Sequence, residues 1–203
     1  MTDKQETYTV APERLAPIPE GKMTEAQKKA AAEIAAGRRG SVRGPFHAFL
    51  RSPTLMGRVQ KLGEYLRYDS LVEQRLRELA ALMAARDWTQ QYEWHAHVPH
   101  ALKAGLKAEV IEAVAEGRRP AGMAADEEIV HDFVRELLAN RGVSDPTYER
   151  ALKQFGEAGV VELISVVGYY ALLAMVMNVA RTAVPDGKPL PLPLLPQQLR
   201  VKG

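Results

Sequence analysis

The chain has 203 residues, 46% of them hydrophobic, which is enough to build one domain around a buried core. Its 27 basic and 25 acidic residues leave a net charge of +2 without a block of like charge, so we expect no nucleic-acid partner. It has no cysteine, which excludes disulfides, thiolate metal sites and cysteine redox chemistry.

The N-terminal segment is predicted to be extended. Residues 1–6 are polar and charged and lack an apolar signal core, so we expect a cytoplasmic protein. Prolines recur in the first 23 residues, which favours an extended arm over 1–23. Thr24 and Gln27 then form a capping-box pattern that opens a helix, and Gly37 closes it.

Helical patterns fill most of the following chain, and strand signals are few. A glycine- and arginine-rich loop is expected at 38–45. The predicted helices span 24–36, 53–67, 70–85, 89–104, 107–116, 126–140, 146–155 and 160–183. We therefore predict a single all-α domain over residues 24–184.

The predicted helix at 70–85 carries the first candidate site residue. Ser70 and Glu73 fit a capping box at its start, and an apolar stripe follows. The stripe consists of Val72, Leu76, Leu79 and Met83. Glu78 lies at the edge of this stripe, so we expect partial desolvation to favour its neutral, proton-carrying form.

The predicted helix at 89–104 places four polar side chains on one face. They recur at steps of three and four residues, which is the spacing of neighbours on a helix surface. They are Gln90, Glu93, His97 and His100. His95 points away from the face that Glu93 and His97 share.

An apolar segment near the C-terminus predicts a buried helix. Residues 163–177 carry no charge, but the segment is shorter than the ~20 residues that a membrane span needs. A helix that is apolar all round often buries its second face against another subunit. We therefore expect no membrane contact and a homo-oligomer, either a dimer, a trimer or a hexamer.

The C-terminal tail, residues 185–203, is rich in proline and predicts an extended strap rather than a folded element. Leucines alternate with prolines along it. These leucines, expected to lie on a neighbouring surface, are Leu190, Leu192 and Leu194.

The spacing of the polar residues resembles a known family. Alkylhydroperoxidase-like proteins carry a glutamate, then eleven residues, then Cys-x-x-Cys-x-x-x-His. The corresponding positions here are Glu78, Gln90, Glu93 and His97, so both cysteines are replaced. Glu93-Trp94-His95-Ala96-His97, followed by Ala104-Gly105-Leu106, looks like the cysteine-free branch, the carboxymuconolactone decarboxylases.

Other segments within residues 40–190 are similar to longer members of the same family. Gly44-Pro45-Phe46 and Leu50-Arg51-Ser52-Pro53 look like their N-terminal entry. Glu162-Leu163, Gly168-Tyr169-Tyr170 and Pro185-Asp186-Gly187 look like their C-terminal helix and its exit. The resemblance implies an alkylhydroperoxidase-like helical bundle and, without cysteine, excludes a thiol peroxidase.

The activity that the resemblance implies is cofactor-free decarboxylation of 4-carboxymuconolactone, or a proton shift on a related small lactone or keto acid. Loss of carbon dioxide leaves electrons on a conjugated carbonyl, which donors must stabilise before an acid returns a proton to carbon. We expect Glu78 to be that acid and Glu93 to fix the tautomer and charge of His97. The donor to the oxyanion is expected to be His97 or Gln90.

The implied substrates are anions, so arginines are candidates for holding them, because a guanidinium offers a planar pair of donors to a carboxylate. Arg51 is the first choice, since it lies in the segment that resembles the family's entry, and Arg43 and Arg86 are the others. Trp94 and His100 complete the predicted substrate-binding residues together with Gln90.

Two alternatives stay open at this point. Glu93, His97 and His100 also fit a metal triad on one helix, which would indicate a metal-dependent hydrolase or isomerase on the same scaffold. Three ligands from one helix rarely complete a tetrahedral site, so we expect no metal. The second alternative is a non-catalytic oligomeric binding protein, because a fold does not determine chemistry.

Overall fold

The computed structural model describes residues 12–185 and 191–192, and in this part of the chain it contains helices and no strand. The all-α prediction is therefore confirmed. The elements are η1 (Glu20–Lys22), α1 (Glu25–Ala36), α2 (Pro45–Phe49), α3 (Pro53–Tyr68), α4 (Gln74–Asp87), α5 (Gln91–Lys103), α6 (Ala108–Ala115), α7 (Ala125–Asn140) and α8 (Asp145–Ala180).

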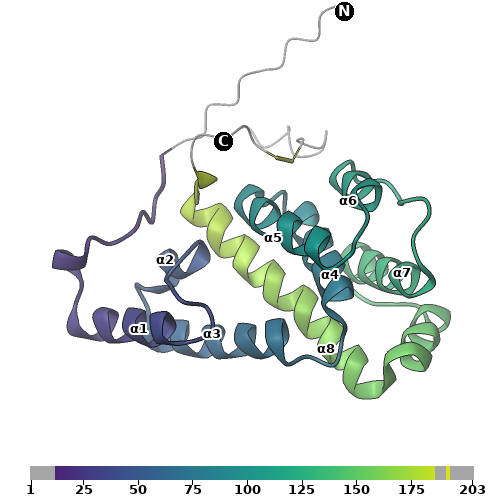
Figure 1. Cartoon of the computed structure of the whole chain (residues 1–203), viewed down its shortest axis with the longest axis horizontal. Helices are drawn as coiled ribbons and strands as arrows, with labels where there is room; N and C mark the ends of the chain where they lie inside the picture. Colours follow the sequence, from purple (N-terminus) through teal and green to yellow (C-terminus); the bar gives the residue numbers. More distant parts are fainter. Residues whose placement is uncertain (1–11, 186–190, 193–203) are drawn as a thin grey trace, which may run out of the picture.

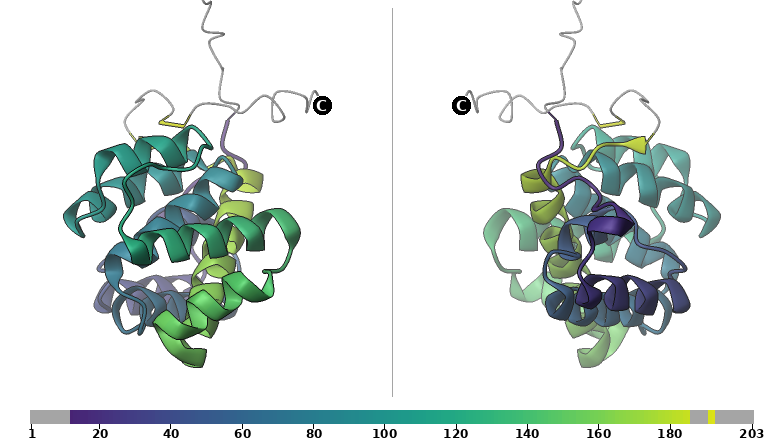
Figure 2. Two further views of the ribbon diagram at one scale, coloured as in Figure 1. Left: turned by 90° about the vertical axis from the view of Figure 1, so that its right-hand side faces the viewer. Right: turned by 90° about the vertical axis from the view of Figure 1, so that its left-hand side faces the viewer.

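Helix α4 forms the centre of the bundle and packs against α5, α7 and α8 (Figure 1). Its leucines are fully buried, and the alanines between them leave room for neighbouring helices to approach from several sides. Helix α1 lies on the opposite side of the molecule from α6 and α7 (Figure 2). The site described below is formed where α5 and α8 meet the segment from α1 to α3.

The capping box predicted at the start of α1 is confirmed. The backbone N–H of Gln27 donates to Thr24 Oγ1 over 3.3 Å, and the backbone N–H of Thr24 donates to Gln27 Oε1 over 2.9 Å. These two bonds satisfy amide groups that the first turn of a helix leaves without partners. The helix ends at Ala36, as predicted.

The predicted start of the next motif helix at Ser70 is wrong. Helix α4 begins at Gln74, with Glu73 as its N-cap residue. Ser70 instead donates its hydroxyl to Glu162 of α8 over 2.6 Å. Glu162 also accepts from the backbone N–H of Leu71, so this carboxylate ties the turn before α4 to a distant helix.

The loop predicted at 38–45 ends in a short helix that the sequence did not predict, α2. Gly44 precedes it with φ of 54°, a left-handed conformation that favours glycine. A Cβ atom at this position would also overlap the ring of Tyr92 on α5. Pro45 then occupies the first helical position, where a missing N–H costs nothing.

The two last predicted helices are joined in α8, which has a kink between them. Gly156 has φ of 67° and ψ of 174°, which is not helical, so the predicted division is confirmed in position. Among the described helices, α8 is long and apolar enough to cross a membrane, a test that a core helix also passes. More than half of its most apolar stretch is buried inside the molecule, which agrees with the predicted buried helix.

The other face of α8 is apolar and exposed. The exposed side chains follow one another at steps of three to eight residues along the helix. They are Val161, Ile164, Leu172, Met175 and Val179.

The predicted arm and tail lie only partly within the described residues. Residues 12–19 are without regular structure, and the backbone N–H of Arg14 donates to the carbonyl of Ala180 over 2.8 Å, which places this segment at the end of α8. In the tail, Leu192 is buried and its backbone bonds twice to the side chain of Gln91. Leu190 and Leu194 lie outside the described residues.

Candidate active site

A cavity of about 330 Å³ lies between α5, α8 and the segment from the end of α1 to the end of α3. Its lining is cationic and aromatic. The basic side chains are Arg38, Arg39, Arg43, Arg67, His97 and His100, the tyrosines are Tyr68, Tyr92, Tyr169 and Tyr170, and the carboxyl group is that of Glu93.

A histidine and a carboxylate are paired beside this cavity. Nδ1 of His97 lies 2.6 Å from Oε2 of Glu78, and both side chains are buried. The ring of His97 is further fixed by an edge-on contact with Tyr170, with 4.6 Å between the ring centres. Since Nδ1 is occupied by Glu78, Nε2 is the ring nitrogen left for chemistry.

Glu78 is ionised in this arrangement. Burial acts to raise the pKa of Glu78, but the charge and hydrogen bond of His97, together with Arg67, outweigh burial and lower that pKa below its usual range. The expectation that desolvation keeps Glu78 neutral is therefore wrong. Its physical role here is that of an anion that orients the imidazole and stabilises its charged form.

Glu93 is the carboxyl group that stays protonated. It is 2% exposed, and complete burial raises its pKa well above the usual range. Neither of its side-chain oxygens has a hydrogen-bond partner within the described residues. A buried carboxyl without partners is costly when ionised, so the neutral acid is the stable form at neutral pH.

Two further polar atoms that line this cavity are buried without a hydrogen bond to any of the described residues. They are the Tyr169 hydroxyl oxygen and Nε of Arg39. Burial raises the pKa of Tyr169 to about 12, so its hydroxyl is a donor at neutral pH. Because orphaned buried polar groups are rare in folded proteins, their collection at one cavity, together with Glu93, indicates a ligand that completes them.

The guanidinium groups around the cavity are held in several ways. Nη2 of Arg67 lies 2.8 Å from Nε2 of His100, so this ring nitrogen accepts, and burial and the Arg67 charge lower the pKa of His100. Arg38 bonds to both carboxylate oxygens of Asp69, over 2.9 and 3.1 Å. His100 is therefore neutral, and the net charge of the lining favours an anion.

Two glycines position tyrosines of the lining. Gly63 of α3 faces Tyr169, and a Cβ atom there would overlap the Tyr169 hydroxyl. Gly44 faces Tyr92 in the same way. The missing side chains therefore set how far both rings reach into the cavity.

Residues 53–130 match the model of the carboxymuconolactone decarboxylase family. This segment of the chain is similar to that family. It runs from the start of α3 into α7 and includes Glu78, Glu93 and His97, whereas the arginine-rich loop and Tyr169 lie outside it. No curated protein matches the chain.

The segment that matches the family model brings several predicted residues together. Glu93, His97 and His100 line one cavity, and Glu78 supports it through His97. Gln90 does not line the cavity. It is the N-cap residue of α5, where its side chain accepts from the backbone N–H of Glu93 over 2.9 Å and donates to Asn178 over 3.1 Å.

The other predicted substrate-binding residues are placed elsewhere. Arg51 donates to the carbonyls of His47 and Ala16, both over 2.7 Å, because the N-terminal segment passes beside it. Arg86 lies at the far end of α4 and contacts Ala115, and Trp94 is buried in the core. Arg43 is the predicted arginine that does reach the cavity.

Sequence reasoning missed Arg38, Arg39 and Arg67 as site residues. The signal for the first two was the clustering of arginines and glycines at 38–45, a predicted loop from which we chose Arg43 alone as a candidate. Arg67 gave no signal, because it ends an ordinary amphipathic helix.

The alternative of a metal triad does not fit the side-chain positions. Glu93, His97 and His100 share a helix, but within residues 12–185 and 191–192 no three His, Asp or Glu side chains are grouped so that they could hold a metal ion. Nδ1 of His97 is occupied by Glu78, and Nε2 of His100 lies against Arg67.

Proposed function

We propose that the protein is a cofactor-free decarboxylase or proton-transfer enzyme that acts on a small lactone or keto-acid carboxylate, with 4-carboxymuconolactone as the nearest substrate. The observation that carries the proposal is a neutral, buried Glu93 beside a carboxylate-supported His97 in one cationic cavity. The pKa is raised for Glu93 and lowered for Glu78, and two carboxyl groups with pKa values pushed apart are what acid/base chemistry at neutral pH needs.

The substrate carboxylates are held by the arginines of the lining. Arg39 and Arg43 stand on the loop before α2, with the guanidinium of Arg39 stacked 4.4 Å from the ring centre of Phe46. Stacking restricts the guanidinium, so little further order is lost when it binds a carboxylate in two-pronged fashion. We therefore assign the binding of the substrate carboxylate to Arg39 and Arg43. Arg51 and Arg86, which were also candidates from the sequence, lie elsewhere.

The bond-breaking step is loss of carbon dioxide. The bond between the carboxylate carbon and its neighbour breaks, and its electron pair moves into the conjugated carbonyl to give an enolate. Donors already aimed at the cavity stabilise the negative oxygen without reorganising. We assign these donors to the Tyr169 hydroxyl and to Nε2–H of His97, whose Nδ1 is held by Glu78.

The proton returns to carbon from Glu93. Its raised pKa keeps the proton in place until the enolate forms, and the ionised Glu93 then recovers a proton from water. One proton is consumed for each carbon dioxide released, and no oxidant or reductant is needed. The roles of Glu78 and Glu93 are thus the reverse of those expected from the sequence.

The protein is proposed to work as a soluble homo-oligomer. The exposed apolar face of α8 defined above supports this, because monomeric proteins rarely leave a continuous apolar stripe in water. A cytoplasmic location stays a prediction.

The test is turnover of 4-carboxymuconolactone by the purified protein, followed by ultraviolet absorbance, with His97→Gln and Glu78→Gln alongside. Loss of turnover in both folded variants supports the proposal. No turnover by the wild type rejects this substrate. Saturable binding of the lactone without turnover would replace the enzyme proposal with a binding protein.

A further inference from the structure

A second cavity of about 470 Å³ lies between the ends of α4 and α6 and one face of α7. None of its lining residues belongs to the candidate active site. Met83, Val114 and Leu138 give it an apolar wall. The cavity is large enough for a small organic molecule, and the proposed reaction leaves it unused.

The charged groups of this lining are mostly basic. The lining contains one carboxylate, that of Asp87, and three guanidinium groups, those of Arg86, Arg118 and Arg135. Burial raises the pKa of Asp87, against the charges of Arg141 and Arg86, which reduces the negative charge that it contributes. The cavity therefore has an excess of positive charge beside its apolar wall.

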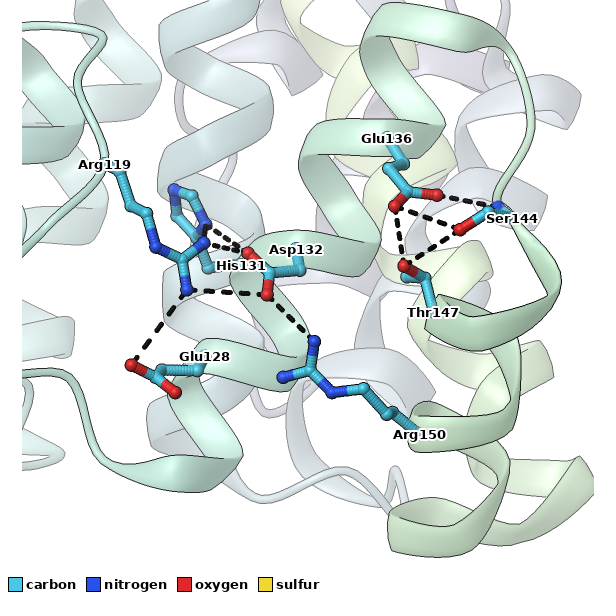
Figure 3. Close-up of polar contacts among 8 residues, drawn as sticks. All are labelled: Arg119, Glu128, His131, Asp132, Glu136, Ser144, Thr147 and Arg150. Atoms are coloured by element: carbon cyan, nitrogen blue, oxygen red, sulfur yellow. Dashed lines mark hydrogen bonds and ion pairs between the residues drawn. The ribbon is translucent and has the colours of Figure 1, made fainter.

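Arg135 differs from the other arginines on this side of the molecule. Arg119 and Arg150 both bond to Asp132, as Figure 3 shows, and Arg118 is paired with Glu116. Within the described part of the chain, Arg135 has neither a hydrogen bond nor an ion pair. Its guanidinium is exposed at the edge of the cavity and free to bind an anion.

His131 adds a buried polar group to the wall. Its Nδ1 lies 3.2 Å from Asp132 Oδ1 and 3.2 Å from Arg119 Nη1 (Figure 3). Burial lowers the pKa of His131, so the ring is neutral at neutral pH. With Nδ1 committed, Nε2 is the ring nitrogen that a ligand can use.

We propose that this second cavity binds a small organic carboxylate with an aromatic or short aliphatic body. The carboxylate pairs with Arg135 near Arg118, and the apolar body lies against Met83, Val114 and Leu138. An inorganic anion would leave that apolar wall in contact with water, so an amphipathic ligand fits the lining better.

The experiment is an NMR titration of the full chain, labelled at its methionine methyl groups, with benzoate as the probe. Met83 lines the second cavity and Met177 lines the candidate active site, so each cavity has its own reporter. Met83→Leu and Met177→Leu identify the two signals. We expect a saturable shift of the Met83 signal at millimolar benzoate.

The variants separate this site from the first one. Arg135→Glu should weaken binding at Met83 by about tenfold or more, because it replaces attraction by repulsion, and should leave the Met177 response unchanged. The matched control is Arg58→Glu, which replaces an exposed arginine of α3 and should change neither the Met83 response nor the Met177 response. A Met83 signal that does not respond, or that responds equally in Arg135→Glu, would overturn the proposal.

Discussion

Oε2 of Glu78 lies 2.6 Å from Nδ1 of His97, and this contact joins α4 to α5 beside the candidate active site. It determines which of the two ring nitrogens faces the cavity and which of two nearby glutamates is ionised. Because Glu78 is paired with His97, the proton-carrying role is left to Glu93, whose side-chain oxygens have no hydrogen-bond partner among the described residues.

Replacing Glu78 by glutamine should reduce turnover by about 10²–10⁴-fold, the usual contribution of a positioned acid/base group. The amide keeps the shape of the side chain but cannot balance the charge of a protonated His97. Steady-state kinetics on the proposed lactone measures the loss. The control is Glu112→Gln, which replaces an exposed glutamate of α6 and should leave the rate unchanged. Equal rates in the two variants would exclude a role of Glu78 in turnover.

Glu93→Gln should change how the stability of the protein depends on pH. The folded pKa of Glu93 is raised, so its contribution to stability is fully present below the unfolded value and is lost as pH rises through the folded value. Over that window wild-type stability should fall by up to about 1.4 kcal/mol per pH unit from this group.

Urea denaturation at a series of pH values measures this effect. The variant cannot ionise, so it should gain stability relative to the wild type as pH rises from acid to neutral. A constant difference between the two proteins across that range would show that Glu93 has an ordinary pKa.

The contact between Gly63 and Tyr169 allows a test of whether the Tyr169 hydroxyl donates to the enolate oxygen. Gly63→Ala should displace the Tyr169 hydroxyl and cost about 1–3 kcal/mol of stability, the usual cost of overpacking. Gly57→Ala lies on the same helix with open space around it and should stabilise the protein by about 0.5–1 kcal/mol.

Substrate affinity separates the site from the fold. Gly63→Ala and Tyr169→Phe should both weaken binding of the lactone, whereas Gly57→Ala should not. If Tyr169→Phe binds and turns over substrate as the wild type does, the hydroxyl is not the oxyanion donor.

An ion-pair cluster between α4 and α7 should be important for stability. Arg75 bonds to Asp126 over 2.6 Å and also to the buried Glu127, and these bonds lower the pKa of Asp126 although burial acts to raise it. Arg75→Met would leave a buried carboxylate without its partner, at a cost of about 3 kcal/mol at neutral pH.

The loss of stability caused by Arg75→Met should be smaller at acid pH. A carboxylate with a lowered pKa gives stability that is lost as pH falls through the folded value, so the difference from the wild type should narrow there. Thermal denaturation at neutral and acid pH measures it, with Arg58→Met as an exposed control. A cost independent of pH would mean that packing rather than charge is lost.

Self-association through α8 can be tested in the same way. Ile164→Glu, in the exposed apolar face, should convert the predicted oligomer to a monomer in light scattering, whereas Leu102→Glu, exposed on α5, should not. A monomeric wild type would contradict the predicted oligomer.

Much of the fold could be predicted because local signals determine it. The capping box of Thr24 and Gln27 fixed the start of α1, and the breaks between helices followed from glycine and proline. Ser70 failed as a helix start because its hydroxyl accepts from the backbone N–H of Val72 in a turn and donates to Glu162, 92 residues away, a partner that no local pattern records.

The site could be predicted only in part for the same reason. Glu78 and His97 are separated by 19 residues, and the sequence placed both in one site but paired His97 with Glu93 instead of Glu78. Which glutamate is ionised depends on the complete burial of Glu93 by helices packed from other parts of the chain. Arg51 was misplaced because the N-terminal segment, through the Ala16 carbonyl, occupies its guanidinium.

The most direct test of the account is carbon dioxide release from 4-carboxymuconolactone by the wild type, Glu93→Gln and Glu112→Gln. We predict release by the wild type and by Glu112→Gln, and its loss in Glu93→Gln, which keeps the fold but has no proton to return to carbon. Release by Glu93→Gln at the wild-type rate, or none by the wild type, would contradict the account.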